Sequence, residues 1–313
     1  MRIGVDAMGG DYAPKEAVLG AINACKELRT GCSIVLYGDS VQIENILKEQ
    51  NYSANNIEIV HTTEVIGMGD HPAKSFQHKK DSSITVGFRD LYSGKIDAFT
   101  SAGNTGAMMV GTMYTIKSIP GIMRPCITSP IPKISGASHG VLLDVGLNSD
   151  CKPDVLYQYG ILGDLFAKYY HKIETPKVCL LNIGEEEEKG NLLTKATFEL
   201  MKDGIHFDFH GNIESNELYT DKADVIVCDG FTGNIVLKQL ESVYKITQQL
   251  QFSHPYLDLF NYENHGGTPV LGVNAPIVIG HGASNAVAFK NMILQTYHIT
   301  NSDLTNKIKQ AFQ

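Results

Sequence analysis

Short apolar and β-branched runs alternate with longer amphipathic segments along most of this chain. Parallel strands need a long crossover between them, usually a helix, so this alternation predicts an α/β fold. Several runs are continuously apolar, as strands buried on both faces are, and we therefore expect a three-layer α/β/α arrangement with a mostly parallel sheet. The expected strands are 3–6, 33–37, 57–61, 98–100, 127–130, 140–144, 177–182, 207–211 and 225–228, and the expected helices are 15–28, 40–50, 83–93, 105–116, 152–171, 191–204, 235–250 and 285–296.

The length of 313 residues allows one large α/β domain or two smaller ones. The chain contains no Ser/Gly-rich linker, no low-complexity region and no fixed-period repeat. We therefore expect a single domain over residues 1–313. Because glycine-rich turns occur in both halves, this domain could consist of two lobes around a cleft.

Charge and cysteine content narrow the function classes. A net charge of -8 and a pI near 5.7, without a Lys/Arg stripe, argue against a nucleic-acid-binding protein. The six cysteines form no CxxC pair and lie mostly beside apolar runs, as buried thiols of a reducing compartment do. The chain starts with a strand-like run instead of a signal peptide, and no apolar stretch reaches the ~18 residues of a membrane span. These features predict a cytoplasmic protein.

Two glycine-rich turns that contain Asn and Thr each follow an expected strand: SAGNTG at Ser101–Gly106 and DGFTGN at Asp229–Asn234. Each precedes an apolar run of helical length. Glycines let the backbone approach an anion, and a helix N-terminus offers unpaired N–H groups and the positive end of a dipole. We expect Asn104 and Asn234 to meet at one site for a small anion.

The turn DAMGGDYAP at 6–14 directly follows the first expected strand. The carboxyl ends of parallel strands line the ligand crevice of an open α/β sheet. Asp6 and the adjacent Gly9 and Gly10 are therefore candidate binding residues. The alternative is a tight turn with a capping aspartate.

A second polar turn follows the expected strand 140–144 and contains Asp144, Asn148 and Lys152. Lys152 could pair with a phosphate or polarise a carbonyl, and Asp144 could orient it. The alternative is an ordinary turn followed by a surface lysine.

Glycine, amide and cation recur in two further turns. Lys189 and Asn191 lie in KGN, which precedes an expected helix, and His281 lies in HGASN. An imidazole can serve as general acid or base near neutral pH. The alternative for His281 is a hydrogen-bonding structural role.

The segment 71–81 concentrates lysines and histidines in an otherwise acidic chain. Such a reversal of sign could steer an acidic partner toward the protein, whereas a solvated helix face is the plainer explanation. The sequence contains no GxxxxGK[ST], GxGxxG, GxSxG or HExxH motif and no His/Cys/carboxylate cluster with metal-ligand spacing.

Seven motifs occur in order between residue 1 and about residue 290: VDAMGGD (5–11), SAGNTGA (101–107), RP (124–125), LLDVGxN (142–148), LLNIG (180–184), KGN (189–191) and DGFTGN (229–234). In this set the chain resembles the bacterial PlsX-type phosphate acyltransferases. The resemblance implies transfer of a long-chain fatty acyl group from acyl carrier protein to inorganic phosphate, which gives acyl phosphate for phospholipid synthesis. It also implies an isocitrate/isopropylmalate dehydrogenase-like fold, a homodimer, no metal or organic cofactor, and functional contact with a membrane glycerol-3-phosphate acyltransferase.

The residues of the turns fit this chemistry. Lys152 and Lys189 would neutralise phosphate charge, and Asp144 or Asp229 would orient phosphate or take its proton. The expected catalytic residues are Asn104, Asp144, Lys152, Lys189 and Asp229. The expected phosphate-binding residues are Asp6, Gly9, Gly10, Ser101, Gly103, Thr105, Gly106, Asn148, Asn191, Thr232, Gly233, Asn234 and His281.

One segment departs from the family. Its members carry a longer helical arm after the DGFTGN helix, with apolar residues for dimerisation and peripheral membrane contact, whereas here only residues 251–261 occupy this position. Three other functions stay open. They are a short-chain phosphotransacetylase that uses acyl-CoA, a nicotinamide-dependent decarboxylating dehydrogenase of the same fold, and a phosphate-binding sensor without catalysis.

Overall fold

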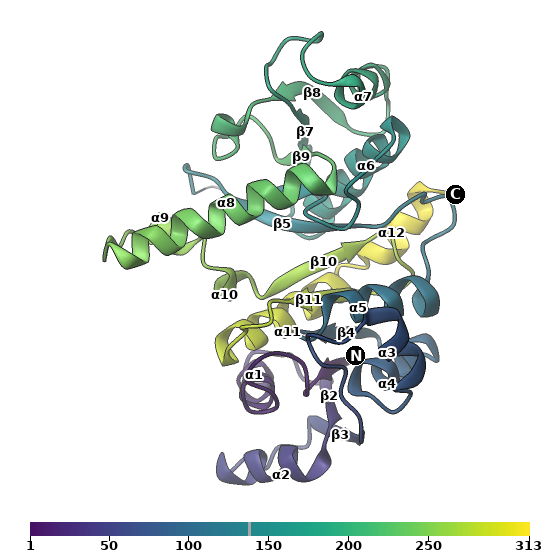
Figure 1. Cartoon of the computed structure of the whole chain (residues 1–313), viewed down its shortest axis with the longest axis vertical. Helices are drawn as coiled ribbons and strands as arrows, with labels where there is room; N and C mark the ends of the chain where they lie inside the picture. Colours follow the sequence, from purple (N-terminus) through teal and green to yellow (C-terminus); the bar gives the residue numbers. More distant parts are fainter. Residues whose placement is uncertain (137–138) are drawn as a thin grey trace. The chain divides into compact units, whose positions relative to one another are not determined.

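The computed structural model describes residues 1–136 and 139–313. The chain divides into two compact units: unit 1 comprises residues 1–118 and 262–301, and unit 2 comprises residues 119–261 and 302–313. Each unit contains a run of mostly parallel strands flanked by helices (Figure 1). The α/β class and the mostly parallel sheet predicted from the sequence are confirmed.

In unit 1 the strands lie in the order β3-β2-β1-β4-β11-β10. All neighbours are parallel except β10 and β11, which are antiparallel. The strands are β1 (Arg2–Asp6), β2 (Ser33–Gly38), β3 (Ile57–His61), β4 (Ala98–Ser101), β10 (Gly267–Leu271) and β11 (Ile277–Gly280). The helices are α1 (Lys15–Cys25), α2 (Ser40–Glu49), α3 (Pro72–His78), α4 (Ser83–Tyr92), α5 (Thr105–Gly111) with its π-helical continuation η1 (Thr112–Ile116), α10 (Tyr262–His265) and α11 (Ala286–Asn301).

Helices cover both faces of the unit 1 strands. Figure 1 shows α1 and α11 on one side of the strands and α3, α4 and α5 on the other. Gly20 lets α1 approach α11 closely, because a Cβ at this position would lie 2.4 Å from Phe289 Cβ. On the opposite face Phe88 of α4 packs edge-on against Phe99 of β4, with ring centroids 5.3 Å apart. Burial on both faces explains why these strands are continuously apolar.

In unit 2 the strands lie in the order β5-β6-β9-β7-β8. The β5–β6 pair is antiparallel, and the other neighbours are parallel. The strands are β5 (Cys126–Pro132), β6 (His139–Leu143), β7 (Lys177–Leu181), β8 (Asp208–Ile213) and β9 (Val225–Val227). The helices are α6 (Pro153–Tyr169), α7 (Leu192–Lys202), the 3₁₀ turn η2 (Ser215–Glu217), α8 (Gly230–Gln249), α9 (Pro255–Asp258) and α12 (Leu304–Ala311).

Alternate residues of the unit 2 strands contact different helices. Val225 faces α6, where a Cβ on Gly163 would lie 2.3 Å from its Cγ1. The next residue, Ile226, belongs to a buried cluster with Leu142, against which Leu240 of α8 packs. Unit 2 is therefore also a sheet between two helical layers, and α8 forms one side of it.

The sequence located most elements well. All nine expected strands occur within two residues of their predicted ends, whereas β10 and β11 were missed. β10 contains Pro269, which lacks an N–H donor, and β11 is too short to be distinguished from a buried loop by its pattern. The short helices α3, α9, α10 and α12 were also missed, since none is long enough to show a clear helical period.

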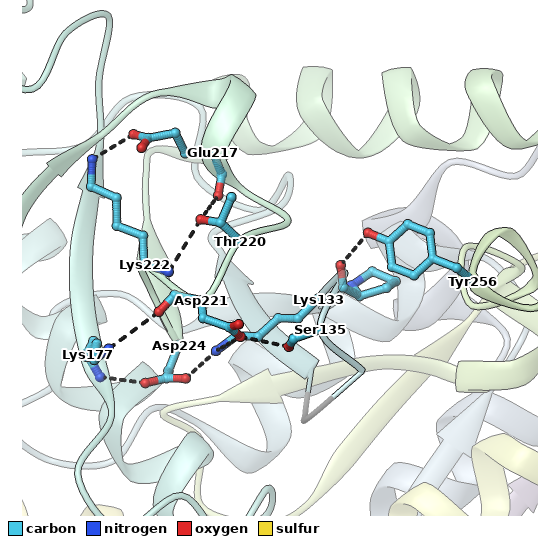
Figure 2. A network of polar contacts seen from close by, with 10 residues as sticks. Lys133, Ser135, Lys177, Glu217, Thr220, Asp221, Lys222, Asp224 and Tyr256 are labelled. Carbon is cyan, nitrogen blue, oxygen red and sulfur yellow. Dashed lines mark hydrogen bonds and ion pairs between the residues drawn. The ribbon is translucent and has the colours of Figure 1, made fainter.

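A polar network joins three segments of unit 2 (Figure 2). Lys133, which is 4% exposed, forms an ion pair with Asp224. The second oxygen of Asp224 accepts the N–H of Lys177 at 2.9 Å. Lys133 follows β5, Lys177 begins β7 and Asp224 precedes β9, so this network lies at the sheet edge opposite the carboxyl ends of β7 and β9.

Some of the apolar side chains of residues 251–261 pack against other residues of unit 2. Tyr256 and Tyr219 both pack edge-on against Phe260, with centroid separations of 5.4 and 5.6 Å. Tyr256 Oη also donates to the carbonyl of Pro132 at 3.0 Å (Figure 2). Phe252 is 60% exposed. Within residues 1–136 and 139–313, the helices include none with the length and apolar character that crossing a bilayer requires.

Candidate active site

Three loops meet at the carboxyl ends of neighbouring strands in unit 1. They follow β1, β4 and β11. The N–H of Asp11 donates to Gly282 O at 2.8 Å, which joins the first loop to the third. A Cβ on Gly9 would lie 2.7 Å from the backbone nitrogen of Gly103, so this glycine lets the first loop touch the second. The predicted grouping of Gly9, Gly10 and Gly103 at one sheet edge is therefore a local arrangement of unit 1.

Asp6 and Ser101 form the base of these loops. Ser101 Oγ donates to Asp6 Oδ2 at 2.6 Å and accepts the N–H of Gly103 at 2.9 Å. Asp6 Oδ1 accepts the N–H of Met8 at 3.0 Å. Asp6 is 1% exposed and Ser101 is fully buried, and burial raises the pKa of the Asp6 carboxyl. These two side chains hold the turns in shape, which is closer to the capping alternative than to direct substrate contact.

Asn104 is the N-cap of α5, and its side chain is fully used within the protein. Its Oδ1 accepts the N–H of Ala107 at 2.9 Å. Its Nδ2 donates to the carbonyls of Gly67, Met68 and Asp70 at 3.0, 3.2 and 3.1 Å. An anion at this turn would therefore meet backbone N–H groups, such as those of Thr105 and Gly106 in the first helical turn, which have no partner within a helix. The structure does not leave the Asn104 amide free for phosphate.

His281 supports its own turn. Its Nδ1 accepts the N–H of Ala283 at 3.2 Å, and its ring packs against Tyr262 with a centroid separation of 4.9 Å. Ser284 Oγ donates to the His281 carbonyl at 2.6 Å. These contacts match the structural alternative for this histidine, and its expected part in phosphate binding stays a prediction.

In unit 2, Asp144 plays the part that Asp6 plays in unit 1. It follows β6, is fully buried, and accepts four hydrogen bonds. The donors are the N–H groups of Ile127 and Leu147 at 3.2 Å each, and the N–H and Nδ2 of Asn148 at 2.7 and 3.1 Å. Burial raises the pKa of the Asp144 carboxyl, and these hydrogen bonds oppose the rise. With four donors around it, Asp144 orients the turn and has little capacity left to take a proton from phosphate.

The turn after β9 packs directly on the Asp144 turn. The N–H of Gly230 donates to the carbonyl of Asn148 at 2.8 Å. A Cβ on Gly233 would lie 1.9 Å from Asp144 O, so only glycine fits there. Asn234 Nδ2 donates to Val145 O at 3.3 Å. Two of the predicted motifs thus form one local group in unit 2.

The DGFTGN motif is itself the first turn of α8. We expected the helix to begin at Ile235, but it begins at Gly230, and that expectation is wrong. Asp229 caps it: Oδ1 accepts the N–H of Thr232 at 2.9 Å, and Oδ2 accepts Thr232 Oγ1 at 2.9 Å. The Asp229 carboxylate is therefore engaged as a cap. Because Gly230 and Thr232 also have acceptors for their N–H groups, Phe231 supplies the first-turn N–H that has no partner among the described residues.

Lys152 and Lys189 are the two lysines among the predicted site residues. Both are exposed, and neither forms an ion pair with any residue the structure describes. Lys152 is the N-cap residue of α6, directly after the Asp144 turn. Lys189 lies in the loop after β7, where Asn182 Nδ2 donates to its carbonyl at 3.1 Å. Asn191 caps α7 by accepting the N–H of Thr194 at 2.9 Å. The two lysines are the available cations of the predicted set.

Sequence reasoning missed Tyr159. This tyrosine of α6 is fully buried, and its hydroxyl accepts a hydrogen bond from Asn148 Nδ2 at 2.8 Å. A tyrosine on the apolar face of a helix looks like an ordinary core residue, so no sequence signal marks it. Within the described ranges 1–136 and 139–313, no three or more His, Cys, Asp or Glu side chains are grouped to hold a metal.

The two Asn turns that we expected to meet belong to different units: Asn104 to unit 1 and Asn234 to unit 2. Each unit has its own buried aspartate, glycine contacts and capped helix at the carboxyl ends of its strands. Their predicted convergence on one anion stays a prediction.

Comparison with known proteins gives the chain its relatives. A family model described as "Fatty acid synthesis protein" matches residues 1–254. Phosphate acyltransferases of Dictyoglomus turgidum and Listeria innocua are each 39% identical to the chain, over 99% of its length and 97% and 96% of theirs. That of Thermoanaerobacterium thermosaccharolyticum is also 39% identical, over 100% of this chain and 97% of its own.

Solved structures show the fold. A phosphotransacetylase from Streptococcus pyogenes superposes with a TM-score of 0.67 at 18% identity, and the EutD phosphotransacetylase from Staphylococcus aureus with 0.66 at 17%. Both matches cover 96% of this chain and 94% of the other. At such identity the likeness concerns the fold alone. The sequence relatives identify the family, and this chain belongs to the phosphate acyltransferases, a family of acyltransferase enzymes.

Proposed function

We propose that this enzyme transfers a long-chain fatty acyl group from acyl-acyl carrier protein to inorganic phosphate and so produces acyl phosphate for phospholipid synthesis. The observation that carries the proposal is the position of Lys152. It is an exposed cation without an ion pair among the described residues, at the start of α6 and directly after the turn that Asp144 orders. The Asp144 turn packs on the first turn of α8, where the N–H of Phe231 has no partner among the described residues.

The chemistry needs positioning and charge stabilisation more than a covalent intermediate. An oxygen of hydrogen phosphate attacks the thioester carbonyl, and the negative charge moves to the carbonyl oxygen. The C–S bond then breaks, and the phosphate proton ends on the carrier's sulfur. N–H donors and a lysine fixed near the reacting atoms lower this barrier by orienting the two reactants and stabilising the developing oxyanion.

The side-chain contacts support a revised set of proposed roles. We propose that Lys152 and Lys189 neutralise phosphate charge, because both are free to pair. Asp144, Asp229 and Asn104 are positioning residues, since their side chains are already engaged by turn and cap hydrogen bonds. The backbone N–H groups of the turns they order would contact the anion.

Several wider features belong to this proposal. We infer that both units form one phosphate acyltransferase domain of the isocitrate/isopropylmalate dehydrogenase type, which the phosphotransacetylase superpositions support. We also infer a cytoplasmic homodimer that needs no metal or organic cofactor. It would receive acyl carrier protein, associate peripherally with the membrane and hand its product to a membrane glycerol-3-phosphate acyltransferase.

A short-chain phosphotransacetylase that uses acyl-CoA is the second candidate, because the fold superposes on two phosphotransacetylases. The test is to incubate the purified protein with palmitoyl-carrier thioester or with acetyl-CoA, and to measure free thiol with and without phosphate. We expect phosphate-dependent thiol release from the palmitoyl carrier. Release from acetyl-CoA alone would support the second candidate, and release from neither would contradict both.

A further inference from the structure

The nitrogen of the Asn148 side-chain amide is fully engaged in hydrogen bonds. Its Nδ2 donates to the carbonyl of Pro125 at 2.8 Å, to Tyr159 Oη at 2.8 Å and to Asp144 Oδ2 at 3.1 Å. A peptide carbonyl and a carboxylate only accept hydrogen bonds, so the end of the amide that faces them must be the nitrogen. The orientation of this side chain is thereby fixed by its partners.

The other end of the amide is open. Within residues 1–136 and 139–313, no group donates to Asn148 Oδ1, and the residue is only half-buried. The backbone of Asn148 is also engaged, because its N–H donates to Asp144 and its carbonyl accepts from Gly230. The free hydrogen-bonding capacity of Asn148 is therefore that of an acceptor. An acceptor is an unexpected feature in a turn predicted to bind an anion.

The neighbouring groups of unit 2 are donors. Asn234 gives one N–H of its amide to Val145 O, and the second N–H of Nδ2 has no acceptor among the described residues. Asn234 lies against the Asp144 turn, because a Cβ on Gly146 would be 2.9 Å from its Nδ2. In the first turn of α8 the N–H groups of Gly230 and Thr232 are already used, and that of Phe231 has no partner among the described residues. Lys152 follows the Asp144 turn and forms no ion pair with any described residue. A ligand at this turn would thus meet several donors and one acceptor.

We propose that Asn148 Oδ1 accepts a hydrogen bond from the P–O–H group of hydrogen phosphate. The turn would then select a tetrahedral oxyanion that still carries a proton. The inference rests on the proposed function and deepens it by naming how the site recognises its nucleophile. Hydrogen phosphate keeps a proton at neutral pH, whereas sulfate, which has nearly the same shape, keeps none. A sulfate oxygen would face the lone pairs of Oδ1, and this unpaired contact opposes binding.

Sulfate and arsenate are the probes that separate shape from protonation. Hydrogen arsenate carries a proton, as hydrogen phosphate does, and is an alternative nucleophile for the thioester. In the wild-type enzyme we expect arsenate to replace phosphate and sulfate to compete poorly, with an inhibition constant at least about tenfold above the KM for phosphate. Sulfate inhibition at concentrations near that KM would overturn the proposal without any variant.

Asn148→Ala removes the acceptor. We expect the ratio of the sulfate inhibition constant to the phosphate KM to fall by about tenfold, while the ratio of the arsenate and phosphate KM values does not change. Tyr159→Phe is the matched control, because it removes one partner of Nδ2 and leaves Oδ1, so it should preserve both ratios. An Asn148→Ala enzyme that keeps the wild-type sulfate ratio would overturn the inference and leave the proposed function intact.

The two proposals fail in different ways. If the wild-type protein releases no thiol from palmitoyl carrier in phosphate, the proposed function is wrong. Titration calorimetry with phosphate and sulfate then still tests Asn148, because selectivity in binding does not depend on turnover. Tighter binding of phosphate than of sulfate in wild type, and equal binding in Asn148→Ala, would support the inference. Equal binding of the two anions by wild type would overturn it.

Discussion

Ser101 Oγ donates a 2.6 Å hydrogen bond to Asp6 Oδ2, and this contact ties the carboxyl end of β4 to that of β1. Both side chains are buried, and Ser101 Oγ also accepts the N–H of Gly103. The contact therefore fixes the direction of the glycine turn that follows β4. A charged group that is buried at a turn needs such partners, since burial without them is costly.

Ser101→Ala should destabilise the protein by about 1.5–3 kcal/mol, because it removes a hydrogen bond to a charged group. Urea denaturation of both proteins measures the difference. The control is Ser93→Ala, which removes a hydroxyl that donates to the Asp90 carbonyl at 3.2 Å and should change stability by less than about 0.5 kcal/mol. Equal effects of the two variants would show that the contact to Asp6 is unimportant.

Asp144 should make the stability depend on pH in an unusual direction. Burial raises its pKa above the ordinary value of 3.8, so the folded state binds this proton more tightly than the unfolded state does. The stabilising contribution is fully present below the unfolded pKa and is lost as the pH rises through the folded pKa. The difference in unfolding free energy between wild type and Asp144→Asn should therefore be most favourable to wild type near about pH 3.5 and decrease as the pH rises toward neutral.

Asp39→Asn supplies a control of opposite sign for that measurement. The pKa of Asp39 is lowered, chiefly by the N–H of Gln42, so its stabilising contribution is present above the unfolded pKa and is lost on acidification. The wild-type advantage over Asp39→Asn should grow with rising pH. If the difference in unfolding free energy between wild type and variant changed with pH in the same direction for Asp144→Asn and Asp39→Asn, the assignment for Asp144 would be wrong.

The ion pair between Lys133 and Asp224 predicts a large effect on stability (Figure 2). Lys133→Met leaves a carboxylate that is 9% exposed without its cation, which should cost about 3–5 kcal/mol. Adding Asp224→Asn removes the stranded charge and keeps an acceptor for Lys177, so the double variant should regain most of the loss. Chemical denaturation of the single and double variants measures this coupling, and additive losses would contradict it.

The sequence located the glycine turns of the candidate site because their signal is local. A strand, a glycine turn and a helix lie within about 15 residues, and the spacing alone places Ser101 and Asp144 at strand ends. The sequence could not show which side chains remain available for substrate. Asn104 in SAGNTG resembles a ligand for an anion. Its side-chain amide instead donates to carbonyls of residues 67–70, which lie more than thirty positions earlier in the chain.

Long-range partners also explain the other differences. Asp229 reads as a catalytic carboxylate in DGFTGN, yet its cap position makes the motif the first turn of α8. The sequence around Tyr159 does not distinguish it from a core tyrosine, because its hydrogen-bond partner is Asn148, eleven residues earlier. Local patterns thus predict elements and turns, whereas hydrogen-bond saturation, which decides the chemistry of each group, depends on partners that the sequence does not reveal.

Lys152→Ala should raise the KM for phosphate by about tenfold or more, because an unpaired ammonium next to a phosphate contributes a charge-assisted hydrogen bond. The KM for the acyl carrier should change much less. Lys48→Ala is the control: this exposed lysine lies 3.8 Å from Glu44 on α2, and its removal should leave both constants unchanged. Wild-type kinetics with phosphate in Lys152→Ala would exclude this lysine from anion binding.

The basic segment 71–81 supplies the last prediction, which concerns the carrier. Lys79 is not available to a partner, since it pairs with Asp70 at 2.7 Å and donates to Val65 O at 2.7 Å. Lys74 and Lys80 are exposed and form no ion pair with any part of the chain that the structure describes. They are the residues able to attract an acidic carrier.

Replacing both Lys74 and Lys80 with glutamate should raise the KM for the acyl carrier several-fold, and the effect should weaken as salt is added, because rim charges act by steering association. The KM for phosphate should stay the same, which separates docking from damage to the anion site. Lys48→Glu makes a charge reversal on α2, away from this segment, and should affect neither constant. If the double reversal leaves the carrier KM unchanged at low salt, the carrier binds elsewhere on the enzyme.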